Sequence, residues 1–140
     1  MKKKAKEALA VFATGKRKRA VARASLKPGK GLIKVNGIPL PLVSDDIARL
    51  RMQEPLLIAG EPAAGLDIAV TVHGGGPMGQ AEAARMAIAR CLVQQIGAEL
   101  KKQFMEYDRN LLIYDSRRTE THKPPHSSWG ARRYKQRSKR

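Results

Sequence analysis

The sequence predicts a single α/β domain with a strongly basic segment at each end. Residues 66–73, LDIAVTVH, alternate between apolar and other side chains, which is typical of a strand with one buried face. Residues 79–97 form an uninterrupted, alanine-rich run that favours a helix. The cations gather toward both termini, so the middle of the 140-residue chain can fold around a modest core.

The charge distribution divides the chain into three parts. The net charge is +10 over residues 1–30, −2 over 31–116 and +8 over 117–140. We therefore expect a basic extension at 1–9, a globular domain at 10–116 and an extended basic tail at 117–140. Blocks of positive charge repel internally, and contact with a polyanion stabilises them. No run approaches the roughly 20 apolar residues of a membrane span, so nucleic acid is the expected partner and a membrane is not.

Two further features suit a cytoplasmic protein. The apolar stretch that follows the N-terminal lysines is too short for the hydrophobic region of a signal peptide. Cys91 is the only cysteine, which excludes an internal disulfide framework. We therefore expect the protein in the cytoplasm.

Two β-type segments precede the first expected helix. Residues 9–26 contain two β-prone runs, and Gly15 is expected to form the turn between them, giving a hairpin. Residues 31–40 predict a short strand, which the Asn36-Gly37 pair closes with a turn.

Residues 45–60 predict a helix. Ser44 or Asp45 can accept hydrogen bonds from the free amides of its first turn. Gly60 ends the helix, and Pro55 is expected to kink it or to split it in two.

The second half of the domain contains a strand and two helices. The residues that share one face of the 66–73 strand are Leu66, Ile68, Val70 and Val72. The 79–97 helix has two apolar stripes, so the sheet and another helix are expected to cover it. A short helix follows at 98–108. Beyond residue 115 the apolar periodicity ends, and this segment alone is expected to be extended or disordered.

A glycine-rich loop joins the expected strand and helix in TVHGGGPMGQAEAAR, residues 71–85. Gly74, Gly76 and Gly79 match the dinucleotide-binding spacing G-x-G-x-x-G. That fold also needs an acidic residue about 20 positions later, after a second strand, whereas Glu99 begins a helix-like segment. No Gly-Lys-Ser/Thr follows, so a P-loop is excluded as well. We expect no cofactor and no small-molecule substrate.

Two interpretations of this loop remain, and both can hold. The glycines can allow a sharp turn with positive φ and close backbone packing. Alternatively, the free amides of the first helical turn can bind an RNA phosphate. We expect turn geometry to be the main role and treat Gly74, Gly75 and Gly76 as candidate RNA contacts.

The segment TGKRKRAVARA, residues 14–24, carries the first dense group of cations. Such a run can be a solvated face or a localisation signal, but adjacent positive charges repel one another unless an anion intervenes. Arg17, Arg19 and Arg23 are expected to share one strand face that suits an RNA backbone. The candidate RNA-binding residues of this segment are Lys16, Arg17, Lys18, Arg19 and Arg23.

The C-terminal tail combines arginines with aromatic residues. Arginine outnumbers lysine there by six to three, which favours bidentate phosphate contacts. Two of the chain's six aromatic residues lie in the tail, where they have no core to fill and can stack on unpaired bases. The candidate RNA-binding residues of the tail are Arg117, Arg118, Trp129, Arg132, Arg133, Tyr134 and Arg137.

Other reactive residue types do not assemble into a catalytic or metal site in the sequence. The residues that could bind a soft metal lack zinc-site spacing; they are His73, His122, His126 and Cys91. Asp45 and Asp46 are expected to cap a helix, and Asp108 with Arg109 to fix a turn. The competing hypotheses are a nucleotide-dependent enzyme that uses the glycine loop and a general basic nucleic-acid chaperone.

Several motifs stand in the order found in one protein family. They are TGKRKRAVARASLKPGKGLIKVNG, MQEPLLIAG, TVHGGGPMGQAEAARMAIAR, YDRNLL, DSRR and the terminal SKR. Over about residues 10–140 the chain resembles the family of small-ribosomal-subunit protein nine. MQEPLLIAG and YDRNLL are similar to its archaeal and eukaryotic branch.

The resemblance implies a fold, partners and a location. The fold would be a two-layer α+β domain like the second domain of small-subunit protein five, with a left-handed βαβ crossover. The implied partners are the 3′ major (head) domain of small-subunit rRNA, P-site tRNA and neighbouring small-subunit proteins, in the cytoplasmic ribosome. Ser138, Lys139 and Arg140 are the implied tRNA-binding residues.

Overall fold

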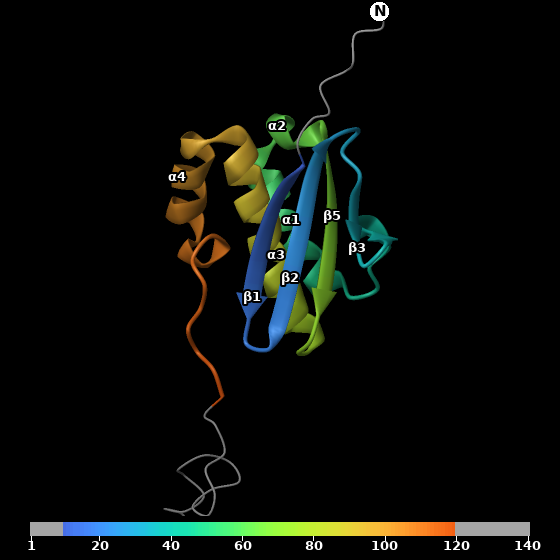
Figure 1. The fold of residues 1–140 in the computed structure, drawn as a ribbon, viewed down its shortest axis with the longest axis vertical. Helices are drawn as coiled ribbons and strands as arrows, with labels where there is room; N and C mark the ends of the chain where they lie inside the picture. The colour runs from blue at the N-terminus through green and yellow to red at the C-terminus, as the bar shows by residue number, and fades with distance from the viewer. Residues whose placement is uncertain (1–9, 120–140) are drawn as a thin grey trace, which may run out of the picture.

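The computed structural model describes residues 10–119, which form one five-stranded sheet with helices on one of its faces (Figure 1). The expected two-layer α+β fold is confirmed. Within these residues, no helix is both long and apolar enough to cross a bilayer. The elements in chain order are β1 (Val11–Arg17), β2 (Ala20–Pro28), β3 (Ile33–Val35), β4 (Ile38–Pro39), η1 (Leu40–Leu42), α1 (Asp46–Ala59), α2 (Glu61–Ala64), β5 (Leu66–His73), α3 (Pro77–Ile96), α4 (Ala98–Tyr107) and η2 (Arg109–Leu111).

The strand order in the sheet is β1-β2-β5-β3-β4. The pairs β1–β2, β2–β5 and β3–β4 are antiparallel, whereas β3 and β5 are parallel. The chain passes from β3 to β5 through α1, which lies behind the sheet in Figure 1. Both strands point downward there and the path runs from right to left, so the crossover is left-handed, opposite to most such connections.

The N-terminal hairpin turns at Lys18 and Arg19, so the predicted turn at Gly15 is wrong. Gly15 lies within β1 and pairs with Ala22. A Cβ atom on Gly15 would lie 2.1 Å from the carbonyl oxygen of Ala83 in α3. The glycine is therefore needed because the helix backbone passes close to the strand.

The segment predicted as one short strand is a small hairpin of β3 and β4, joined by Asn36 and Gly37. Both turn residues have positive φ, at 50° and 81°. The Asn36 side chain accepts a hydrogen bond from the Val72 amide at 2.8 Å and donates one to the Val72 carbonyl at 3.2 Å. These bonds fix the turn to β5.

Helix α1 starts and ends as predicted but is not split. The Asp45 carboxylate accepts hydrogen bonds from the amides of Ile47 and Ala48, at 3.0 and 3.2 Å, and Gly60 follows the last residue with φ of 62°. The buried Pro55 lies inside the continuous helix. Packing of its ring in the core offsets the missing hydrogen bond.

Helix α3 is covered on two sides, as its two apolar stripes predicted. It contacts β1 and β2 on one side and α1 on the other. Small buried residues form the contact between helix and sheet; they are Ala13, Gly15, Ala20, Ala22 and Ala24 of the strands and Ala83, Ala84 and Ala87 of α3. Larger side chains such as Leu26, Ile88 and Phe104 fill the rest of the core. The strand at 66–73 and the helix after Gly97 are also confirmed.

Candidate nucleic-acid interface

Three segments far apart in the sequence meet at one end of the molecule. They are the β1–β2 hairpin turn, the glycine loop before α3 and the C-terminal segment that leads to Thr119. Together they line an open groove, whose walls include Arg17, Lys18, Arg19, Gly75, Gly76 and Thr119. Asp45 and Glu82 also line it. The sequence predicted each segment as an RNA contact, and the fold places them side by side.

The glycine loop packs directly against the hairpin turn. Gly74 and Gly75 have φ of 77° and 68°, which favours glycine strongly. A Cβ on Gly74 would lie 2.6 Å from the Arg19 carbonyl oxygen, and one on Gly75 would lie 3.2 Å from the Ala20 nitrogen. The expected role in turn geometry and close packing is confirmed.

Gly76 differs from the two glycines before it. Its φ is −99°, a Cβ there would meet nothing within 4 Å, and it is the N-cap of α3. Pro77 occupies the first helical position, where proline is well tolerated. No side chain within residues 10–119 caps this end. The amides of Met78 and Gly79 have no intrahelical acceptor, so the helix presents N–H groups and a positive dipole beside the groove.

The basic run of the hairpin is split between the two faces of the sheet. Lys16, Lys18 and Arg19 are exposed at the hairpin end, and Arg23 is exposed on the face away from the helices. The Arg17 side chain is only 18% exposed and lies on the helix-covered face. The expectation that Arg17 shares a face with Arg23 is therefore wrong, because the two side chains belong to opposite sets of the strand alternation.

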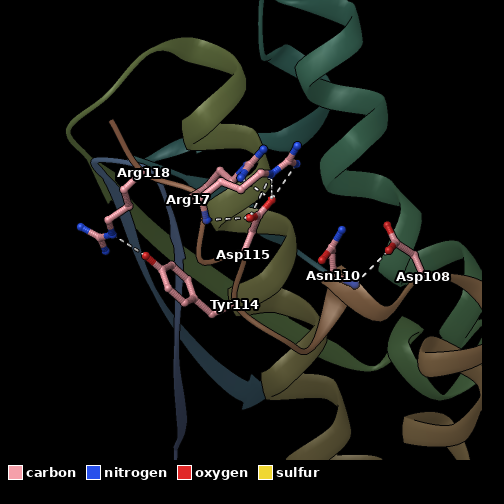
Figure 2. A network of polar contacts seen from close by, with 7 residues as sticks. Arg17, Asp108, Asn110, Tyr114, Asp115 and Arg118 are labelled. Carbon is pink, nitrogen blue, oxygen red and sulfur yellow. Dashed lines mark hydrogen bonds and ion pairs between the residues drawn. The ribbon is translucent and has the colours of Figure 1, made fainter. Parts of the chain in front are cut away.

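Arg17 forms an ion pair with Asp115, whose carboxylate also binds Arg117 (Figure 2). Arg17 Nη1 lies 2.5 Å from Asp115 Oδ2. Arg117 donates from Nη2 to Oδ2 at 2.8 Å and from its amide to Oδ1 at 2.9 Å. The side-chain hydrogen bond from Arg117, its amide and the charges of both arginines lower the pKa of Asp115 to about 2. The same partner raises the pKa of Arg117.

The next residue carries its charge at the surface. Arg118 Nε donates to the Tyr114 hydroxyl at 2.6 Å, and the guanidinium carbon lies 5.5 Å from the centre of the Tyr114 ring (Figure 2). This cation–π contact leaves Arg118 exposed. Tyr114 therefore orients Arg118 without neutralising it.

Two arginines of α3 hold residues 108–115 against the rest of the domain. Arg85 is 3% exposed and pairs with Asp108 at 2.9 Å and with Glu54 of α1. Asp108 also accepts from the Asn110 amide at 2.9 Å, so its predicted role in fixing a turn is confirmed (Figure 2).

Arg90 supplies the second attachment. Its Nε and Nη2 donate to the Leu112 carbonyl at 3.0 and 2.8 Å, and its Nη1 donates to the Thr14 carbonyl at 2.7 Å. Residues 108–115 are therefore fastened along α3 and β1, and the chain leaves toward the hairpin end. Sequence reasoning missed Arg85 and Arg90. A cation between the two apolar stripes of α3 was the available signal, since a charge buried there needs a partner.

The remaining predicted residues divide into two groups. Those that lie outside the described residues are His122, His126, Trp129, Arg132, Arg133, Tyr134, Arg137, Ser138, Lys139 and Arg140. Among those described, Cys91 is buried against the sheet, and burial raises its pKa to about 11. His73 is exposed at the end of β5. Between residues 10 and 119, no three metal-binding side chains come together.

Comparison with known proteins identifies the family. Residues 15–140 match the model of the family described as ribosomal protein S9/S16. The chain is 47% identical to small ribosomal subunit protein uS9 of Aeropyrum pernix, with 93% of this chain and 96% of the relative covered. It is 43% identical to uS9 of Methanococcus maripaludis strain C7, with 93% and 98% covered. The chain therefore belongs to the ribosomal protein S9/S16 family, a family of structural proteins of the ribosome and not of enzymes.

Proposed function

We propose that this chain binds the 3′ major (head) domain of small-subunit rRNA in the cytoplasmic ribosome, and that its tail contributes to the surroundings of P-site tRNA. The observation that carries the proposal is the single groove formed by the hairpin turn, the glycine loop and the segment leading into the tail. The relatives are named as small-subunit proteins. The groove supplies a site of contact for the RNA that such a protein would meet.

The charges at this end suit a phosphate backbone. The exposed cations are Lys16, Lys18, Arg19, Arg117 and Arg118. The N-terminus of α3 adds unpaired amides that favour an anion. Asp115 is already paired with two arginines, so its negative charge opposes RNA less than a free carboxylate would.

The fastened segment explains how the tail begins near the same RNA. Arg85, Arg90 and Arg17 hold the chain between residues 108 and 115. The tail therefore starts at the groove and continues from there. On this proposal Trp129 and Tyr134 stack on RNA, the tail arginines contact its phosphates, and residues 138–140 reach the tRNA.

The hairpin turn gives the most direct test of rRNA binding. The double variant Lys18→Gln with Arg19→Gln should bind a 3′-major-domain transcript with a weaker salt dependence. The slope of log K against log salt is negative, and its magnitude should fall by about two. Lys101→Gln with Lys102→Gln on α4 removes the same charge from exposed positions elsewhere and should leave the slope unchanged. Equal slopes for the two double variants would contradict the proposed interface.

Specificity separates this proposal from a general nucleic-acid chaperone. If the basic ends neutralise about ten phosphates, affinity should fall by roughly 10³ to 10⁵ between about 50 and 200 mM salt. At physiological salt the chain should still prefer the 3′-major-domain transcript over an unrelated RNA of equal length. Equal affinity for both would favour the chaperone.

The tRNA part of the proposal has a separate test. Deletion of residues 138–140 should leave incorporation into the small subunit nearly intact and weaken tRNA binding at the P site. Deletion of residues 117–140 should impair both. Failure of the shorter deletion to enter the subunit would show that the tip also serves assembly, contrary to this division of roles.

A further inference from the structure

The face of the sheet opposite the helices is open and carries its own set of cations. It faces the viewer in Figure 1, with α1 and α3 behind it. The side chains that point to this face alternate with the buried residues of β1, β2, β3 and β5. The exposed cations among them are Lys16, Arg23, Lys27 and Lys34.

The strand register fixes how these residues are arranged. One row across the sheet reads Phe12, Ser25, Ala69 and Lys34. The next row reads Thr14, Arg23 and Thr71, and the third reads Lys16, Val21 and His73. Adjacent strands are about 5 Å apart and successive rows about 7 Å. Cations are thus spread over a surface of mostly small side chains.

Phe12 is the large aromatic residue of this surface. Its side chain is 71% exposed, and it lies on β1, the edge strand of the sheet. Its cross-strand neighbour is Ser25, followed by Ala69. An exposed ring beside small residues on an open sheet is a surface on which a nucleic-acid base can stack.

One acidic residue, Asp67, lies on this face, opposite Lys27 of β2 in the strand register, and offsets one of the four positive charges. Its Oδ1 accepts hydrogen bonds from the amides of Lys30 and Leu32, both at 2.8 Å. These bonds lower the pKa of Asp67. The carboxylate therefore stays ionised while it holds the loop before β3, and four cations against one anion leave the face with a net positive charge.

We propose that the open face of the sheet is a second RNA-binding surface, with Arg23 and Lys34 contacting phosphates and Phe12 stacking on an unpaired base. The inference rests on the proposed function and extends it. The row that contains Lys16 and His73 adjoins the hairpin turn and Gly74. A strand of rRNA held at the groove can therefore continue onto this face.

The composition of the face favours RNA over a protein partner. The centre of a protein–protein interface is depleted in charged residues and rich in apolar contact. This face has four cations, one large aromatic ring and otherwise mostly small or polar side chains. RNA-binding surfaces combine cations with exposed aromatic rings in this way.

Binding of the full chain to a 3′-major-domain transcript tests the phosphate contacts. In the double variant Arg23→Gln with Lys34→Gln, the magnitude of the slope of log K against log salt should fall by about two. The matched control is again Lys101→Gln with Lys102→Gln, which should leave the slope unchanged. If the Arg23 and Lys34 double variant binds with the affinity and salt slope of the wild type, the proposal is overturned. That result is also the one expected if a protein, and not RNA, covers this face.

Phe12→Leu tests stacking while keeping an apolar side chain. We expect affinity to fall roughly 5- to 100-fold with no change in the salt slope, because a stacking contact and not a charge is removed. Tyr107→Leu on α4, where the tyrosine is 60% exposed, is the matched control and should bind as wild type. Equal affinity of Phe12→Leu and wild type would overturn the stacking role.

Two comparisons make the outcome decisive. If the Lys18 and Arg19 variant loses affinity and the face variants do not, the open-face proposal fails while the groove stands. If none of them loses affinity, the proposed function fails as well. In the unaltered complex, ultraviolet cross-linking should place RNA adducts on the open face, at Phe12 or Arg23, in addition to any at the hairpin turn. Adducts confined to other parts of the chain would overturn the proposal without any substitution.

Discussion

The two faces of the same sheet use alternate residues of β1 and β2 for opposite purposes. On β1 and β2 the helix-covered face consists largely of alanine and glycine, which brings α3 close to the strands. The open face carries exposed cations and Phe12. One face therefore provides stability, and on our proposal the other provides contact with RNA. Alternation along a strand lets two such requirements be met within seven to nine residues.

Arg17 and Arg23 show the difference at single residues. Both belong to one basic run, yet Arg17 forms an ion pair with Asp115 on the covered face and Arg23 is exposed on the open face. A cation's position in the alternation decides whether its charge is free for a partner. Changes on the covered face should therefore reduce the free energy of unfolding, and changes on the open face should reduce RNA affinity.

The largest effect on stability is expected at Arg85. Arg85→Met leaves Glu54 and Asp108 without their buried partner, which should lower the free energy of unfolding by about 3–5 kcal/mol in urea denaturation. The control Arg49→Met breaks a surface pair with Asp46 and should cost less than about 1 kcal/mol. Equal losses for both variants would mean that burial does not distinguish the two ion pairs.

The next largest effect is expected at Gly15. The Cβ of Gly15→Ala would overlap the backbone of α3, at 2.1 Å from Ala83 O and 2.7 Å from Ala87 N. Moving helix and strand apart should lower the free energy of unfolding by about 1–3 kcal/mol. At Gly65 a Cβ meets nothing within 4 Å, so Gly65→Ala should stay within about 0.5 kcal/mol of wild type. An unchanged urea midpoint for Gly15→Ala would contradict close packing of this face.

A smaller effect is expected at Asp115 as the pH falls. Its pKa is about 2 in the folded chain, against an ordinary value of 3.8. A carboxyl group whose pKa is lowered by folding stabilises the fold above its unfolded pKa and loses that contribution as it is protonated. The stability difference between wild type and Asp115→Asn should therefore shrink from pH 4 to pH 2.

The pH prediction has an independent measurement. NMR titration of the Asp115 carboxyl carbon should give a midpoint near 2. A midpoint near 3.8, or a stability difference that does not change with pH, would show that Arg17 and Arg117 do not hold this carboxylate.

The sequence predicted most elements because their periodicity is local. The alternation of 66–73 and the two stripes of α3 were sufficient to identify a half-buried strand and a helix covered on both sides. The hairpin turn was misplaced because Gly15 was interpreted as a turn residue, whereas a helix distant in sequence requires it. Pro55 was expected to kink the helix or to split it, and it does not split it, because Pro55 is buried within one continuous helix.

The candidate interface was predictable in its parts but not in its pairing. Runs of cations and the glycine loop identified the three segments that meet at the groove. No local pattern shows that Asp115 forms an ion pair with Arg17, or that Arg85 and Arg90 hold residues 108–115. These contacts join positions that are far apart in the chain. The placement of the tail residues beyond 119 stays a prediction.

A density map of the small ribosomal subunit with this chain in place tests the central claim most directly. We predict rRNA phosphates within hydrogen-bonding distance of Lys18, Arg19 and the amides at the start of α3, with Arg17 still paired to Asp115. A map in which the hairpin turn and the glycine loop face solvent or protein, with no rRNA beside them, would contradict the account.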